Sequence, residues 1–189
     1  MNSSRASTNW SADVRSAFDI LEAYERRSLA HAVQMPELAF DENVWRGVGF
    51  RVGKRHLVSD FREVVEIVRM PSVTPVPGAQ PWLLGVGNLR GNLFPVIDLK
   101  QFLQGERTAL QEGQRVLIVR QSGGDVALTI DELFGQRSFT AAQAIEPGDL
   151  AQGRYVHFID RAFRSDAQDW GVFSLSLLSR TPEFRQAAA

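Results

Sequence analysis

Residues 85–99 read GVGNLRGNLFPVIDL, and they carry the most informative pattern in the chain. Apolar runs of strand length, residues 83–89 and 93–99, flank Gly91 and Asn92, which favours two short strands joined by a tight turn. A dinucleotide-binding loop needs G-x-G-x-x-G at the start of a helix. Here the third glycine comes one residue late and an extended, proline-containing run follows. The stretch therefore predicts a β-hairpin and no cofactor site.

Short strands separated by turn signals recur on both sides of this hairpin. Residues 63–70 are expected to begin as a helical turn and end as a strand, and four prolines predict an irregular loop over residues 71–81. Alternating β–α units are absent, so about seven to nine short strands favour barrels or a sandwich. The expected strands are residues 48–52, 56–59, 83–89, 93–99, 115–120, 126–130, 134–139, 155–159 and 170–175.

The composition changes near residue 44. All 15 glycines lie between Gly47 and Gly171. Before that range, Ser11 is a candidate helix cap, and apolar side chains recur at near-helical spacing. We therefore expect a partly helical extension over residues 1–44, which either packs on the body or binds a partner. A main domain over 45–178 and a tail over 179–189 follow.

Charge and residue usage exclude several classes of protein. The net charge is −1, so the chain has no excess of basic residues. The chain contains no cysteine, which rules out disulfides, thiol catalysis and cysteine-ligated metals. His31, His56 and His157 are far apart, so no metal site is expected. Residues 1–13 lack the apolar run of a signal peptide, and runs such as 116–119 are too short to cross a bilayer. We expect a cytoplasmic protein that does not insert into membranes.

Two other functions are weighed against the sequence. Asp98 and Asp131 both end apolar runs, and two facing carboxylates would support acid–base catalysis in a small-molecule enzyme. At strand ends such residues more often cap turns. A barrel that binds single-stranded nucleic acid would use exposed aromatic residues and basic charge. Because most aromatic residues fall on core-facing positions and the charge is balanced, no nucleic-acid partner is expected.

From about Trp45 to Leu178 the chain resembles the CheW family of chemotaxis coupling proteins. Residues 85–91 match the family's G-V-x-N-L-R-G pattern, and 94–99 match its following P-V-x-D-L strand. Within the family, residues 45–50 and the long N-terminal extension resemble the PilI type, found in the chemosensory (Pil-Chp) systems of type IV pili. Three further matches keep the family's order: Val64-Val65-Glu66-Ile67, Pro77-Gly78 with Trp82, and Leu128-Thr129-Ile130-Asp131.

This resemblance implies both a fold and a function. The fold is mostly β, with two small SH3-like, five-stranded β-barrel subdomains, short helices and the N-terminal helical extension. The function is that of a non-catalytic adaptor without cofactors. One surface binds the regulatory domain of a CheA-type histidine kinase, and a groove between the lobes binds the cytoplasmic tip of a methyl-accepting receptor. The PilI type implies control of twitching motility, and a general CheW-type adaptor of flagellar chemotaxis is the alternative.

The matched motifs supply the candidate binding residues. Four apolar members are expected to form the floor of the groove. Glu66 and Arg90 carry opposite charges, and we expect them to form a half-buried pair that holds the groove in shape; the alternative is that both are solvated strand residues without such a role. Losing one partner of such a pair costs roughly 3–5 kcal/mol if the other stays buried. The candidate receptor- and kinase-binding residues are Val64, Glu66, Ile67, Val86, Asn88, Leu89 and Arg90.

Overall fold

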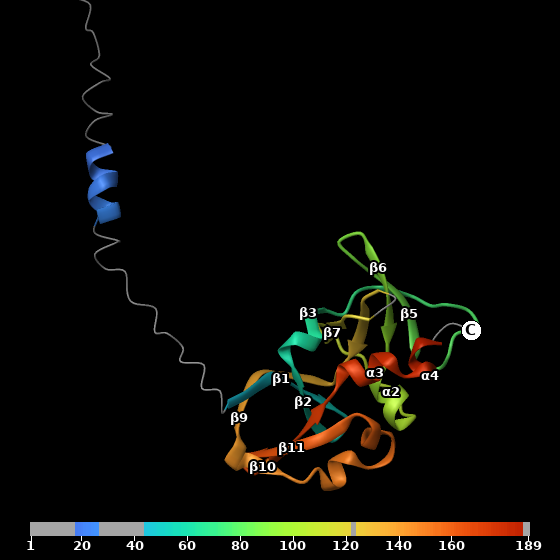
Figure 1. The fold of residues 1–189 in the computed structure, drawn as a ribbon. Coiled ribbons are helices and arrows are strands. Elements are labelled where there is room, and N and C mark those ends of the chain that lie inside the picture. The colour runs from blue at the N-terminus through green and yellow to red at the C-terminus, as the bar shows by residue number, and fades with distance from the viewer. Residues whose placement is uncertain (1–17, 27–43, 122–123, 187–189) are drawn as a thin grey trace, which may run out of the picture. The chain divides into compact units, whose positions relative to one another are not determined.

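The computed structural model describes residues 18–26, 44–121 and 124–186 (Figure 1). Residues 18–26 form a helix that belongs to a first unit, Met1–Asp41, and the second unit is Glu42–Ala189. The predicted helix cap at Ser11 lies outside the described residues. None of the helices within the described ranges is long and apolar enough to span a bilayer.

The described part of the second unit contains twelve strands in two sheets. The first sheet, which we call lobe 1, consists of β1 (Val44–Val52), β2 (Arg55–Asp60), β9 (Glu132–Thr140), β10 (Ala144–Ile145), β11 (Ile159–Ser165) and β12 (Gln168–Phe173). The second sheet, lobe 2, consists of β3 (Val64–Arg69), β4 (Val73–Thr74), β5 (Leu83–Leu89), β6 (Asn92–Ile97), β7 (Arg115–Val119) and β8 (Val126–Thr129). The short helices are α2 (Leu99–Gln104), α3 (Leu175–Arg180), α4 (Pro182–Arg185) and the 3₁₀ helices η1 (Phe61–Glu63), η2 (Ala141–Gln143), η3 (Gly148–Ala151) and η4 (Gly153–His157).

Lobe 1 curls on itself around aromatic side chains. Its strand order is β10-β11-β12-β2-β1-β9, with β12 and β2 parallel. Phe139 comes from the edge strand β9 and Phe163 from β11 near the opposite edge, yet their ring centroids are 4.8 Å apart. This contact brings the two sides of the sheet together around a core that also contains Val58, Trp170 and Val172.

Lobe 2 has the order β3-β7-β8-β6-β5-β4, with β6 and β8 parallel. Alternate residues of its strands point to one side, as expected for period-two patterning, and enclose a second core. Val68 of the edge strand β3 and Phe94 of β6 both belong to this core. The other members of the lobe 2 core are Val96, Val116, Ile118 and Ala127.

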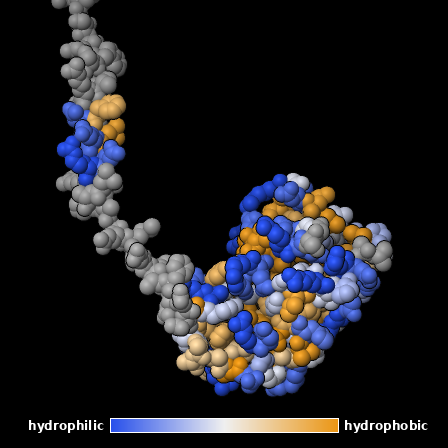
Figure 2. All heavy atoms as spheres, in the orientation of Figure 1, coloured by the Kyte–Doolittle hydropathy of each residue, from blue (hydrophilic) through white to orange (hydrophobic). Residues whose placement is uncertain are grey.

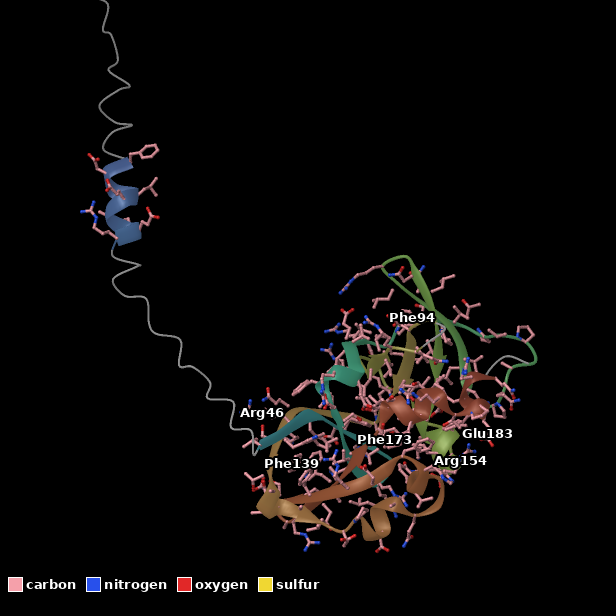
Figure 3. The ribbon with its side chains drawn as sticks, viewed as in Figure 1. Arg46, Phe94, Phe139, Arg154, Phe173 and Glu183 are labelled. Carbon is pink, nitrogen blue, oxygen red and sulfur yellow. The ribbon has the colours of Figure 1, made fainter. Side chains whose placement is uncertain are left out.

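A third core lies between the lobes and fixes them to each other. Phe50 and Leu57 enter it from lobe 1, and Leu117 and Leu128 enter it from lobe 2, all of them fully buried. The helices α2, α3 and α4 lie at this junction (Figure 1). In Figure 3 the labelled side chains Phe94, Phe173 and Phe139 lie in the lobe 2 core, the central core and the lobe 1 core, respectively.

The C-terminal helices are part of the central core. Phe184 of α4 is 2% exposed and stacks on Trp82, which directly precedes β5, with ring centroids 6.0 Å apart. Arg154 pairs with Glu183 (Figure 3). The guanidinium carbon of Arg154 lies 4.4 Å from the centre of the Phe102 ring. The segment expected as a tail, residues 179–189, thus contributes Phe184 to the core.

The structure confirms the mostly β, two-lobed prediction and corrects several details. Each lobe has six strands in its sheet rather than five. The loop 71–81 contains the short strand β4, because Val73 and Thr74 lie between the prolines and pair with β5. Residues 155–159 are mostly the 3₁₀ helix η4 rather than a strand. Tyr155 and Phe158 are both buried three residues apart, a spacing that suits a 3₁₀ helix.

Candidate protein-docking surface

The candidate surface surrounds the open end of lobe 2, where the β5–β6 turn meets β3 and the β7–β8 hairpin. A cavity of about 380 Å³ opens there. Two of its apolar side chains face solvent, since Leu93 is 70% exposed and Val65 is 43% exposed. We call this site the lobe 2 mouth; its lining residues are Val65, Glu66, Leu89, Arg90, Asn92, Leu93, Phe94, Ile118 and Asp125.

A two-residue turn places Arg90 at the rim of the mouth. Leu89 pairs with Asn92, so Arg90 and Gly91 alone make the connection. Both have positive φ angles, 54° and 89°, as a type I′ hairpin turn requires. The side-chain oxygen of Asn88 accepts a hydrogen bond from Gly91 N at 2.9 Å. Asn88 therefore stabilises the turn that presents Arg90.

Arg90 reaches across the open side of lobe 2 to Glu66 on β3. Arg90 Nη2 lies 2.9 Å from Glu66 Oε1, and Arg90 Nη1 lies 3.4 Å from Oε2. The predicted pair therefore forms, but it is not half-buried: the Arg90 side chain is 74% exposed and that of Glu66 is 37% exposed. Exposed pairs of this kind contribute about 0–1 kcal/mol. The pair fixes where two charges are presented and contributes little to folding.

A β-bulge in β3 exposes Val65. In the pairing of β3 with β7, Val64 faces Val119 and Glu66 faces Ile118, which leaves Val65 as an extra residue. Val64 and Ile67 instead pack against the central core.

The sequence predicts that the four apolar candidates form one floor. In the structure they do not lie together. Leu89 packs against the lobe 2 core, whereas Val64 and Ile67 pack against the central core. Val86 is partly buried and belongs to neither core. The reason is strand alternation interrupted by bulges, which sends neighbouring apolar residues to different sides of the sheet.

The apolar face of the β5–β6 hairpin continues beyond the core into solvent. Leu93, Pro95 and Ile97 lie on the same face of β6. Ile97 is 1% exposed in the central core, whereas Leu93, at the far end of the strand, is largely exposed. Val86 faces Pro95 across the hairpin, and Asn88 faces Leu93. An exposed apolar strand end on a rigid hairpin suits contact with another protein.

Sequence reasoning missed Val65 and Leu93. Period-two spacing places Leu93 on the same face of β6 as Ile97, but it does not show that the strand end at Leu93 extends beyond the core. Val65 had no local signal, because its exposure depends on the bulge, which forms only when β3 pairs with β7.

The entry to β3 is held by short-range polar contacts. The Asp60 carboxylate accepts hydrogen bonds from Arg62 N at 2.8 Å and Arg62 Nε at 3.0 Å and caps η1. These bonds lower the pKa of Asp60.

The two aspartates of the enzyme alternative have structural partners. Asp98 is 1% exposed and accepts hydrogen bonds from Gln101 N, Thr108 N and Thr108 Oγ1 at 2.6–3.1 Å. Asp131 accepts one from Gly53 N at 2.5 Å. Asp131 also lines a cavity of about 690 Å³ whose lining does not include Asp98. Each carboxylate anchors a loop, and the two do not converge in that cavity.

Most aromatic side chains of the second unit lie inside it. Phe50, Phe139 and Phe173 are at most 1% exposed. Among the described residues from 44 onward, Phe61 is the one aromatic side chain with large exposure. The stacking platform that the nucleic-acid alternative requires is therefore not formed by these residues.

Comparison with known proteins gives consistent results. The family model described as "CheW-like domain" matches residues 46–183. Protein PilI of Pseudomonas aeruginosa is 33% identical over 180 residues, which cover 94% of this chain and 99% of that protein. Protein FrzA of Myxococcus xanthus is 29% identical, over 74% of this chain and 88% of its own length. The crystal structure of the scaffolding protein TtCheW from Thermoanaerobacter tengcongensis is similar in fold, with a TM-score of 0.61 and 22% identity, covering 72% of this chain and 93% of that one.

Proposed function

The chain belongs to the CheW-like domain family, and from this premise we propose that it is a non-catalytic adaptor of a chemosensory system. It couples the cytoplasmic tip of a methyl-accepting receptor to the regulatory domain of a CheA-type histidine kinase. Its similarity to PilI along nearly the whole chain supports a role in type IV pilus twitching motility over a general role in flagellar chemotaxis. The adaptor acts in the cytoplasm, without a cofactor and without inserting into a membrane.

The observation that carries this proposal is the lobe 2 mouth. Leu93 and Val65 are exposed apolar side chains, and the charged pair of Glu66 and Arg90 lies with them around one cavity. An adaptor makes and breaks no covalent bonds, so it needs apolar contact area on rigid strands and a few charges that set the register of the partner.

The residues predicted from the sequence take different parts in this surface. Glu66 and Arg90 contact the partner, together with Leu93 and Val65. Asn88 holds the turn. The partly buried members Val64, Ile67, Val86 and Leu89 position the strands beneath these contacts.

Figure 2 shows apolar side chains interspersed with polar ones over the visible face of the second unit. Such mixed surfaces are typical of interfaces that exchange, and small interfaces bind weakly. We therefore expect weak binding, with a dissociation constant of about 1 μM or higher, for each partner taken alone.

Calorimetric titration of the purified chain with a CheA-type regulatory domain, and separately with a receptor tip, tests the proposal. Arg90→Glu should weaken binding to at least one partner at least about tenfold, because a like charge then faces Glu66 and the partner loses a cation. The control is Arg69→Glu, a charge reversal at the other, exposed end of β3, which should bind like the wild type. Wild-type protein that binds neither partner contradicts the proposal.

A charge swap separates the pair from its surroundings. The double variant Glu66→Arg with Arg90→Glu restores the attraction in reverse and should recover part of the lost affinity. If the loss of binding free energy in the double variant equals the sum of the losses in the two single variants, the pairing of Glu66 with Arg90 does not contribute to binding.

A further inference from the structure

Glu63 joins the start of β3 to a helix more than a hundred residues away. Its side chain is partly buried and accepts three hydrogen bonds. Ser174 Oγ donates to Oε1 at 3.2 Å, Ser176 N donates to Oε1 at 3.1 Å, and Leu175 N donates to Oε2 at 3.1 Å. Both carboxylate oxygens therefore hold the first turn of α3.

This contact sits beside the candidate docking surface. Glu63 ends η1 and immediately precedes β3, so Val65 and Glu66 follow it by two and three residues. The preceding strand is attached to the same place, because the fully buried Ser59 donates from Oγ to the Phe173 carbonyl at 2.6 Å. The crossing from lobe 1 to β3 is thus fixed twice to the junction of β12 and α3.

The same C-terminal helices also reach the other half of the mouth. The segment α3–α4 carries Phe184, which stacks on Trp82 directly before β5. The backbone carbonyl of Trp82 accepts from Asp98 N at 2.8 Å, next to the end of β6. The segment α3–α4 therefore contacts Glu63 at the start of β3, the strand that carries Glu66. It also contacts Trp82 at the start of the β5–β6 hairpin, which carries Arg90 at its turn.

We propose that Glu63 is a positioning residue of the lobe 2 mouth. It fixes β3 against α3 so that Val65 and Glu66 stand at the correct distance from Leu93 and Arg90. This inference rests on the proposed docking function. A carboxylate that only capped a helix would affect folding and leave partner binding unchanged.

Two substitutions at this contact separate positioning from capping. Glu63→Gln removes the charge and one of the two acceptor oxygens. Ser174→Ala also weakens the start of α3, because Ser174 Oγ accepts from Leu177 N at 3.2 Å, but it leaves the bonds from Leu175 N and Ser176 N to Glu63 in place.

We expect Glu63→Gln to weaken binding of the partner that uses the mouth at least about fivefold, the lower end of usual coupling between two sites. Its amide spectrum should show shifts at Val65, Glu66 and Arg90 as well as at Leu175. Ser174→Ala should lower the melting temperature but keep the affinity within about twofold of the wild type, because Glu63 still holds β3.

Wild-type affinity in Glu63→Gln overturns the inference, and so does an equal loss of affinity in Ser174→Ala. If Glu63→Gln does not fold, Glu63→Asp replaces it. This variant keeps the charge but shortens the reach, and it must also bind more weakly than the wild type. Failure of the proposed function is recognised separately, since it would appear as a wild-type protein that binds no partner.

Discussion

Arg90 is an unusual residue for its backbone conformation. Its φ of 54° lies in the left-handed region, where residues other than glycine, asparagine and aspartate are uncommon. The sequence Asn-Gly is the preferred pair for a type I′ turn, yet this turn is Arg-Gly. The arginine is therefore better explained by what its side chain does than by what its backbone prefers.

The variant Arg90→Asn separates these two roles. We expect the free energy of unfolding to stay within about 0.5 kcal/mol of the wild type or to rise, because the turn gains a better residue and loses only an exposed ion pair. Partner affinity should fall at least about tenfold. Urea unfolding and calorimetric titration measure the two effects, and a variant that keeps full affinity would contradict the role given to Arg90.

We expect His56 to make the stability of lobe 1 depend on pH. Its ring lies 5.1 Å from the Phe134 ring and 5.2 Å from that of Trp170, and its buried Nδ1 has no hydrogen-bond partner among the residues that the structure describes. Burial, and secondarily the positive charge of Arg51, lower the pKa of His56. The folded state therefore favours the neutral ring.

The sign of the pH effect follows from that shift. The unfolded chain has a histidine pKa of about 6.5 and takes up a proton more readily than the folded protein. Stability should fall as the pH drops below about 6.5, until the lowered folded pKa is passed. His56→Phe keeps a stacked ring and should flatten this dependence between about pH 5 and 7 in thermal unfolding curves. An equally steep dependence in that variant would show that other groups cause it.

At the level of elements, the β4–β5 contact depends on a glycine. Gly85 has a φ of 143°, and an added Cβ would lie 2.1 Å from the carbonyl oxygen of Thr74 on β4. Gly85→Ala should therefore cost at least about 2 kcal/mol of unfolding free energy. Gly113→Ala is the matched control, since Gly113 also has a positive φ, 77°, but open space around it. Equal losses in the two variants would show that backbone strain, not the contact with β4, sets the cost.

Helix α4 is stabilised mainly by one side chain. Phe184 is 2% exposed and contacts the rings of Trp82 and Phe102, at centroid distances of 6.0 and 5.4 Å. Phe184→Ala should lower the free energy of unfolding by about 3–5 kcal/mol. Exposed Leu177→Ala in the neighbouring helix should cost less than about 1 kcal/mol. A small loss at Phe184 would mean that α4 is not part of the folded core.

The sequence predicted the elements whose signals are local. Glycine and proline punctuation with apolar runs located β5, β6, β7 and β8, and the opposite charges of two motifs predicted the pair of Glu66 and Arg90. Features that need partners distant in the chain were not predictable. The bulge at Val65 exists through pairing with β7, and the burial of Phe184 depends on Trp82. The exposure of the Glu66–Arg90 pair also depends on how β3 is placed relative to the β5–β6 turn, which a local sequence pattern does not predict.

At the scale of the whole molecule, the second unit is built around three hydrophobic cores. The central core takes residues from both lobes, so the lobes are held together as one body, while each lobe has a smaller core of its own. Among the described residues, no further strand pairs with β3 at its end of the lobe 2 sheet, and the Glu66–Arg90 pair lies on this side, where we propose that other proteins bind. A rigid body with an open edge is suited to hold a second protein in a fixed orientation.

The most direct test of the adaptor function is whether the chain bridges its two partners. A receptor tip is immobilised, and the kinase regulatory domain is passed over it with and without the chain. Retention of the kinase domain should require the chain, should be lost with Arg90→Glu and should persist with Arg69→Glu. Kinase retention that is the same with and without the chain, or binding of the two partners that is mutually exclusive, would contradict the adaptor function.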